Sequence, residues 1–252
     1  MVKMIMHGCN GRMGRMIAGI VDSDPDIEIV TGVDINTEQT GSFPVVDSID
    51  KADEGADVVV DFGNASAVDK VIDWCVSKKI PLVECTTGLS DETLKKFNDA
   101  SSSVAMFKSA NMSLGINIIQ KILKENAARL AEAGFDVEIV EKHHRTKLDA
   151  PSGTALALAD SVNEGLEKRK DYVFDRSGRR MVRPDTEIGI SAVRGGTIVG
   201  DHDVIFAGTD EVITFSHTAY SRAVFAKGAV EAAKFVAGKD PGLYDMSNVL
   251  GS

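Results

Sequence analysis

The N-terminal part of the chain alternates short apolar runs with stretches in which apolar residues recur every three or four positions. Recurrence at that spacing, as in Met13, Ile17 and Ile20, predicts helices. The apolar runs that have the length of buried strands cover residues 3–7, 27–33, 57–62, 81–84 and 103–107. Strands that alternate with helices in this way predict an α/β fold with a Rossmann-like, doubly wound parallel sheet.

The pattern changes after residue 109 and predicts a different architecture. A helix is predicted over residues 114–130, a strand over 136–143, and a further helix near Pro151. Residues 167–184 are charged and carry little apolar content. The next predicted strands, which glycine turns separate, cover residues 187–193, 203–207 and 211–217. This order is typical of an α+β domain with a mostly antiparallel sheet.

The two patterns place domain boundaries near residues 110 and 217. Residues 1–110 are predicted to form the parallel-sheet domain, and residues 111–217 the α+β domain. Residues 218–252 contain a last helical period, which we expect to return to the first domain.

A glycine-rich turn joins the first predicted strand to the first helix. Gly8, Gly11 and Gly14 follow the pattern G-x-x-G-x-x-G, and Asp34 stands about 20 residues later at the end of the second strand. Such glycines let backbone amides approach a pyrophosphate, and the acidic residue accepts a hydrogen bond from an adenosine ribose. A turn that binds nothing is the alternative. The candidate cofactor-binding residues here are Gly8, Cys9, Asn10, Gly11, Arg12, Met13, Gly14 and Asp34.

Asp34 also indicates which dinucleotide is preferred. A carboxylate accepts from the 2′-hydroxyl of NADH and repels the 2′-phosphate of NADPH. Ile35 and Asn36 follow it, so no adjacent basic side chain favours the phosphate. The sequence therefore favours NADH, while Arg12 in the glycine loop leaves NADPH open as a second cofactor.

Further candidate cofactor contacts stand where the later strands of the first domain end. Ligands of open α/β sheets lie at the carboxyl ends of the strands, so these loops are expected near the nicotinamide and its ribose. Ordinary turn chemistry is the alternative for each loop taken alone. The candidates are Phe62, Cys85, Thr86, Thr87, Ser109, Ala110, Asn111 and Met112.

A basic segment before the helix near Pro151 is the clearest candidate for catalysis. His143, His144, Arg145 and Lys147 fall within five positions and precede what reads as a helix start. The capping residue is expected to be Asp149 or Ser152, with Pro151 in the first turn. A helix N-terminus attracts carboxylate or phosphate, so this region predicts an anion site with proton donors at its rim. A solvated connector is the alternative.

Composition narrows the class of protein. The 252 residues are 43% hydrophobic and 26% charged, which fits a globular protein with real cores. The net charge of −10 argues against nucleic acid as a partner. The three cysteines show neither a disulfide framework nor a metal pattern, so a reducing, cytoplasmic compartment and no metal are expected. No apolar run reaches membrane-spanning length, and the short apolar N-terminus does not predict a signal peptide.

Several segments resemble one known family, the bacterial dihydrodipicolinate reductases. The most specific is residues 141–155, Glu-Lys-His-His-Arg-Thr-Lys-Leu-Asp-Ala-Pro-Ser-Gly-Thr-Ala, and the glycine loop is similar to the family's loop as well. The shorter segments that also resemble the family are residues 194–196, 200–202, 206–208, 215–217 and 242–246.

The resemblance implies a Rossmann domain, a substrate-binding and oligomerisation domain, and a homotetramer. It implies reduction of a cyclic dicarboxylate imine of the diaminopimelate and lysine pathway by NADH or NADPH. His143 would be the general acid, with Lys147 beside it to support protonation. Histidine suits this role because its side chain exchanges protons near neutral pH. The residues expected to bind the substrate carboxylates are His144, Ser152, Gly153 and Thr154.

The chain departs from the family pattern at a few positions. Glu84 and Cys85 stand where the family often has glycine before Thr-Thr-Gly, Ile35 replaces a frequent basic residue, and Thr218 replaces an arginine. The histidines expected to be structural or interface groups rather than catalytic are His7, His202 and His217.

Three other functions are alternatives to the reductase. Another NAD-linked amino- or keto-acid dehydrogenase would need the anion site but not the whole of residues 143–154. A non-catalytic dinucleotide sensor would keep the glycine loop but could lose His143 and Lys147. Lys147 as a Schiff-base nucleophile would not explain the cofactor loop.

Overall fold

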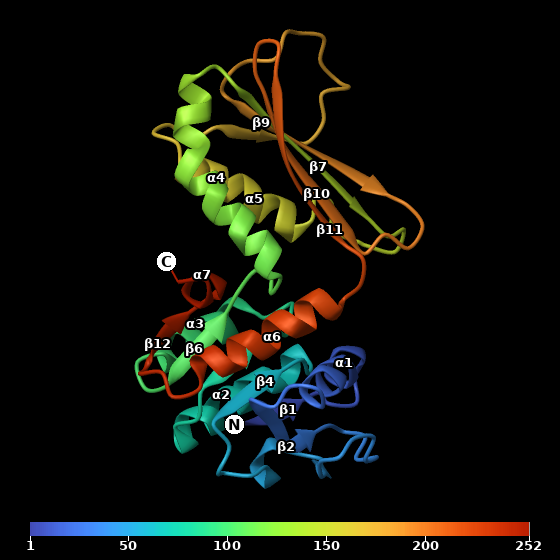
Figure 1. Ribbon diagram of the computed structural model, residues 1–252, viewed down its shortest axis with the longest axis vertical. Coiled ribbons are helices and arrows are strands. Elements are labelled where there is room, and N and C mark those ends of the chain that lie inside the picture. Colours follow the sequence, from blue (N-terminus) through green and yellow to red (C-terminus); the bar gives the residue numbers. More distant parts are fainter. Residues whose placement is uncertain (252) are drawn as a thin grey trace. The chain divides into compact units, whose positions relative to one another are not determined.

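A computed structural model describes residues 1–251, and contacts divide the chain into two units (Figure 1). The N-terminal unit comprises Met1–Ser113 together with the C-terminal segment from Ala223 onward. The central unit comprises Leu114–Arg222. No helix among residues 1–251 is long and apolar enough to cross a membrane.

The N-terminal unit contains a seven-stranded sheet in which all paired strands are parallel. The chain moves from β1 to β2 on one side and then returns to β4 on the other side of β1, so the direction of winding reverses there. The predicted doubly wound parallel sheet is confirmed. In their order across the sheet, the strands are β12 (Gly242–Tyr244), β6 (Ala105–Lys108), β5 (Leu82–Glu84), β4 (Val58–Asp61), β1 (Val2–His7), β2 (Ile27–Val33) and β3 (Val45–Val46).

Helices cover this sheet because their apolar stripes match its buried strands. Helices α2 and α3 form one apolar core with the sheet, and each begins at a side-chain cap. Asn64 accepts from the amide of Ser66 at 3.1 Å, and Ser90 accepts from the amide of Thr93 at 3.1 Å. The helices of this unit are α1 (Arg12–Val21), the 3-10 helix η1 (Ile49–Lys51), α2 (Ala65–Lys78), α3 (Asp91–Ala100), α6 (Ala223–Val236) and α7 (Met246–Val249).

Helix α6 packs on α1 and on strands β4, β5 and β6, as Figure 1 shows. Its buried positions are alanine, glycine and valine, and small side chains of this kind let a helix approach a sheet closely. Lys234 on α6 forms an ion pair with Asp24, 2.9 Å away, which follows α1.

The central unit is a five-stranded sheet with two helices against it (Figure 1). Strand β10 pairs antiparallel with β7 and β11, and these long pairings hold most of the paired positions. Strands β8 and β9 extend the other edge in parallel. The elements are α4 (Leu114–Glu132), β7 (Asp136–His143), α5 (Gly153–Glu164), β8 (Asp171–Val173), β9 (Glu187–Arg194), β10 (Gly200–Ala207) and β11 (Val212–Ala219).

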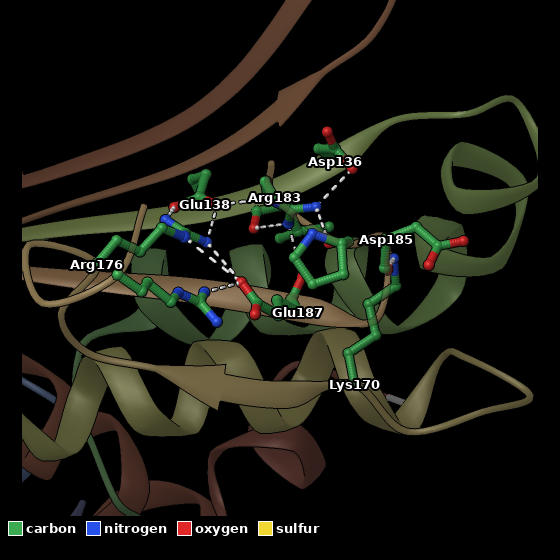
Figure 2. A network of polar contacts seen from close by, with 10 residues as sticks. Asp136, Glu138, Lys170, Arg176, Arg183, Asp185 and Glu187 are labelled. Carbon is green, nitrogen blue, oxygen red and sulfur yellow. Dashed lines mark hydrogen bonds and ion pairs between the residues drawn. The ribbon is translucent and has the colours of Figure 1, made fainter. Parts of the chain in front are cut away.

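Ion pairs hold much of the charged segment, residues 167–184, in place (Figure 2), and Tyr172 adds apolar packing against the core. Both Arg176 and Arg183 bind the carboxylate of Glu138 on β7, at distances of 2.7 and 2.8 Å. Arg183 also reaches Asp136 at 2.6 Å. The short strand β8 lies in this segment, which the hydrophobic pattern left without an element.

The start of α5 differs from the sequence prediction in one respect. Ser152 is the capping residue, and its Oγ accepts from the amide of Ala155 at 3.1 Å. Helix α5 therefore begins at Gly153, and Pro151 lies before the cap rather than in the first turn. The placement of Pro151 was wrong because either of two capping residues satisfied the local pattern.

Candidate active-site residues

The glycine loop closes tightly on the end of β1. Gly8 has a φ of 78°, and a Cβ there would lie 2.6 Å from the carbonyl oxygen of Phe62. A Cβ at Gly14 would overlap the carbonyl of Gly8. Gly11 is the capping residue of α1 and offers no side chain to its first-turn amides. A loop that demands glycine for close approach, ahead of an uncapped helix, fits the pyrophosphate of a dinucleotide.

Asp34 follows β2 and is tied to the glycine loop. Its Oδ2 accepts from the backbone amide of Asn10 at 2.9 Å, and its Oδ1 accepts from the amide of Asn36 at 3.0 Å. The Asn10 side chain in turn donates to the carbonyls of Asn36 and Glu38 at 2.6 and 2.9 Å. The carboxylate is therefore fixed beside the loop, in the position where an acidic residue meets an adenosine ribose.

The other candidate cofactor residues follow the carboxyl ends of β4, β5 and β6. Thr86 is buried, and its hydroxyl oxygen has no hydrogen-bond partner among the described residues. An unpartnered buried hydroxyl at this edge of the sheet fits a polar ligand atom. Cys9 and Met112 are buried in the core, so only their backbone is suited to contact a ligand.

In the central unit, β7 delivers His143 to the buried face of the sheet. Strand alternation places Glu141 and His143 on the same face as the apolar residues that pack against α5. The Nδ1 atom of His143 lies 2.6 Å from Oε2 of Glu141. Nε2 faces Gly200, where a Cβ would stand only 3.1 Å away, so glycine leaves room beside this nitrogen.

Glu141 is fully buried and is surrounded by donors. Arg194 binds it through two nitrogens at 2.6 and 2.7 Å, and the backbone amide of Ser152 donates at 3.0 Å. Burial alone would raise the pKa of Glu141, but the hydrogen bonds from Arg194, His143 and Ser152 lower it below its usual value. Glu141 is therefore an ionised acceptor that fixes the ring of His143 and joins β7, β9 and the start of α5.

His202 on β10 completes this buried cluster. Its Nε2 lies 3.1 Å from the hydroxyl of Ser152, and its ring packs edge-on against His143 with centroids 5.1 Å apart. Burial lowers the pKa of His202 to about 4, and the charge of His143 adds to this effect. His202 is therefore neutral at neutral pH.

The remaining basic residues lie at the rim of the α5 start. Lys147 forms an ion pair with Asp149 at 2.9 Å, and that hydrogen bond lowers the pKa of Asp149, with the amide of Gly153 acting in the same direction. The ring of His144 contacts the hydroxyl of Thr146 at 2.8 Å. A carboxylate of the chain itself thus lies between Lys147 and the first amide of α5.

Glu141 and Arg194 were not assigned a role from the sequence, and His202 was expected to be structural or an interface group rather than catalytic. Glu141 and His202 each occupy a position of an otherwise apolar, alternating strand, so a polar residue on the buried face was the available signal. Arg194 pairs in register with His143 across β7 and β9, which requires the strand order to be known.

Comparison with known proteins connects both units to one family. Residues 2–112 match the family described as dihydrodipicolinate reductase, N-terminus, and residues 115–250 match its C-terminal counterpart. A 4-hydroxy-tetrahydrodipicolinate reductase from Caldanaerobacter subterraneus is 51% identical over 250 residues, which covers 99% of this chain and 98% of the relative. One from Clostridium tetani is 48% identical and covers 100% of this chain and 98% of the relative.

Solved structures agree with this result. A dipicolinate-bound dihydrodipicolinate reductase from Paenisporosarcina sp. TG-14 matches with a TM-score of 0.77 and 26% identity, over 97% of each chain. A myo-inositol dehydrogenase from Corynebacterium glutamicum matches with a TM-score of 0.61 at 15% identity, over 93% of this chain and 87% of that one. The second likeness concerns the fold alone.

Proposed function

The chain belongs to the dihydrodipicolinate reductase family, and on that premise we propose how its residues divide the reaction. The protein is an NAD(P)H-dependent oxidoreductase that reduces 4-hydroxy-tetrahydrodipicolinate to tetrahydrodipicolinate, a step of diaminopimelate and lysine biosynthesis. One observation supports this assignment of roles. The ring of His143 is hydrogen-bonded to the ionised and fully buried Glu141, next to the start of α5.

Cofactor binding is assigned to residues 1–110. The glycine loop would meet the pyrophosphate through backbone amides, and Asp34 would accept from the adenosine ribose. The loops after β4, β5 and β6 would receive the nicotinamide end, with the buried Thr86 hydroxyl as a donor. When bound, the nicotinamide supplies the hydride. NADH is the preferred form, because Asp34 carries the charge that opposes a 2′-phosphate.

Substrate binding is assigned to residues 111–217. The related structure from Paenisporosarcina holds dipicolinate, a planar dicarboxylate, and we propose that this chain binds a dicarboxylate of the same kind. Lys147, His144 and the amides of Gly153 and Thr154 would hold its carboxylates, with Ser152 beside them. The Asp149 carboxylate already lies between Lys147 and the Gly153 amide, which supports this region as a carboxylate site.

Proton delivery is assigned to His143. Addition of hydride to a conjugated imine builds negative charge that an acid must neutralise. Glu141 accepts at Nδ1 of His143, which fixes the ring and leaves Nε2 to give its proton toward the space beside Gly200. Lys147 would stabilise the charge that develops before the proton is transferred.

We also propose a homotetramer in the cytoplasm. The face of the central sheet that the helices leave uncovered bears exposed apolar side chains at Val193 and Val212, and apolar residues at such positions suit contact with a second copy. Sedimentation of the purified protein should give the mass of four chains, and a monomer would contradict this assembly.

Steady-state kinetics test the assignment of roles. With freshly generated substrate, oxidation of NADH should be more efficient than oxidation of NADPH. His143→Ala should lower kcat by about 10²- to 10⁴-fold, the usual contribution of a positioned acid. Lys142→Ala is the matched control, because Lys142 lies next to His143 on the opposite face of β7 and should leave kcat unchanged. An unchanged kcat for His143→Ala would remove this residue from the mechanism.

A further inference from the structure

Four neighbouring strands of the N-terminal unit each end in an ionisable residue: His7 on β1, Asp61 on β4, Glu84 on β5 and Lys108 on β6. The sheet pairs His7 with Asp61, Asp61 with Glu84, and Glu84 with Lys108. The residues two positions earlier in each strand belong to the apolar core under α2 and α3. Side chains alternate between the faces of a sheet, so the four ionisable residues form one row on that same face.

The two carboxyl groups at the centre of this row are fully buried. Asp61 Oδ1 accepts from the amide of Gly63 at 2.7 Å and lies 2.6 Å from His7 Nδ1. Glu84 Oε1 accepts from the amide of Thr86 at 2.7 Å. Asp61 Oδ2 and Glu84 Oε2 find no donor among the described residues, and the two carboxyl groups stand at paired positions of adjacent strands on one face of the sheet.

A single proton would supply the donor that these two buried carboxyl oxygens lack. Two adjacent buried carboxyl groups do not both ionise readily, and a proton between them satisfies both of the oxygens that lack a donor. We propose that Asp61 and Glu84 share one proton, and that this pair positions the loops after β4 and β5 for the nicotinamide end of the cofactor. The proposal rests on the cofactor contacts assigned above. Both are positioning residues, because they act through the backbone of those loops.

The surroundings favour Glu84 as the residue that carries the proton. Burial raises the pKa of Glu84 to about 9, the charge of Asp61 adds to this, and Lys108 opposes it. Burial also raises the pKa of the Cys75 thiol on α2 and of the Cys85 thiol, so both are neutral. The buried side chains of α6 and α3 at the sheet are uncharged, and His7 contacts the other carboxyl group of the pair, Asp61.

The pair is linked to both loops through short contacts. The amide of Cys85 donates to the backbone carbonyl of Asp61 at 3.0 Å, so the loop after β5 is tied to the end of β4. A side chain at Gly63 would displace the His7 ring, because a Cβ there would lie 2.6 Å from it. Loss of the shared proton would leave two adjacent buried charges, and their repulsion would displace the amides of Gly63 and Thr86.

The test is the dissociation constant of NADH, measured by fluorescence on the full chain from neutral pH upward. The wild-type Kd should be constant until the pair loses its proton near pH 9 and should then rise about tenfold per pH unit, as release of one proton requires. Glu84→Gln, whose amide still donates to Asp61 but does not ionise, should abolish this rise. Glu92→Gln, at an exposed position on α3, is the matched control and should behave as wild type. Equal pH profiles for wild type and Glu84→Gln would overturn the positioning role.

Infrared spectroscopy tests the shared proton without any cofactor. The wild type should show a carboxylic-acid C=O band at neutral pH that Glu84→Gln lacks, and absence of the band in wild type would overturn the pair. Asp61→Asn should also remove the pH dependence, which covers a Glu84 variant that fails to fold. Thr86→Ala tests the cofactor contact separately from the shared proton. If this variant leaves the Kd of NADH unchanged while the carboxylic-acid band is present, the cofactor assignment fails and the shared proton stands.

Discussion

Replacement of Glu141 by glutamine is the sharpest perturbation of the central unit. The carboxylate accepts from four donors: two nitrogens of Arg194 at 2.6 and 2.7 Å, Nδ1 of His143 at 2.6 Å, and the amide of Ser152 at 3.0 Å. Glutamine has nearly the same shape, but one of its oxygens becomes an NH₂ group. Each oxygen of the carboxylate meets two of the four donors, so two donors would then face an NH₂ group.

The expected loss of stability follows from burial. Hydrogen bonds to charged groups are worth about 1.5–3 kcal/mol each, and breaking a buried ion pair costs about 3–5 kcal/mol. The Glu141 side chain is 0% exposed, but that of Arg194 is 20% exposed and regains some solvation. The free energy of unfolding should therefore fall by about 3 kcal/mol, the lower end of that range. The kcat should fall as well, because the His143 ring loses the acceptor that orients it.

Glu138→Gln is the matched control for this experiment. Glu138 lies on the same strand and also binds two arginines, but its side chain is 26% exposed. Its loss should be about 1 kcal/mol, typical of ion pairs near the surface, with kcat unchanged. Urea unfolding and steady-state NADH oxidation measure both quantities. A Glu141→Gln enzyme that is as stable and as active as the control would refute the role given to Glu141.

Three further perturbations test other parts of the molecule. Asp34→Ala should weaken the binding of NADH about tenfold, the value of one hydrogen bond to a charged group, and should affect the binding of NADPH less. Titrations with both cofactors measure this, and the opposite order would contradict the ribose assignment. The pKa of His202 is lowered to about 4 in the folded state, so the unfolded chain binds a proton more readily between about pH 6.5 and 4. The free energy of unfolding should therefore fall by about 1.4 kcal/mol per pH unit as the pH drops through that range. His202→Gln should remove this slope in urea unfolding, and equal slopes would show that His202 is not desolvated. Ser152→Ala should cost about 1 kcal/mol as a lost helix cap, as Ser90→Ala should on α3, but only the former should lower kcat.

The fold class followed from local periodicity, because strands and helices each bury one face at a fixed spacing. The parallel sheet and the glycine loop were predictable for that reason. Residues 167–184 were not, since Arg176 and Arg183 are ordered by carboxylates of β7 that lie about 40 residues earlier in the chain. Charge partners at such a separation leave no periodic signal.

The candidate site shows the same division. His143 and Lys147 stand in one short segment and were visible in the sequence, and the resemblance to the family, now confirmed, added their roles as predictions. Glu141 lies two residues from His143, but its importance depends on Arg194 and His202, which β9 and β10 bring to it. The role of Glu141 could therefore be recognised only once the order of the strands in the sheet was known.

Single-turnover reduction tests how the two units divide the reaction. We propose that the N-terminal unit holds the hydride donor and that His143 of the central unit supplies the proton. The enzyme–NADH complex is mixed rapidly with freshly generated substrate, and loss of NADH absorbance is followed for wild type and His143→Ala. If this division is right, His143→Ala leaves the Kd for NADH unchanged and lowers the rate at least about 100-fold. An unchanged rate, or a loss of NADH affinity that accounts for the whole effect, would contradict it.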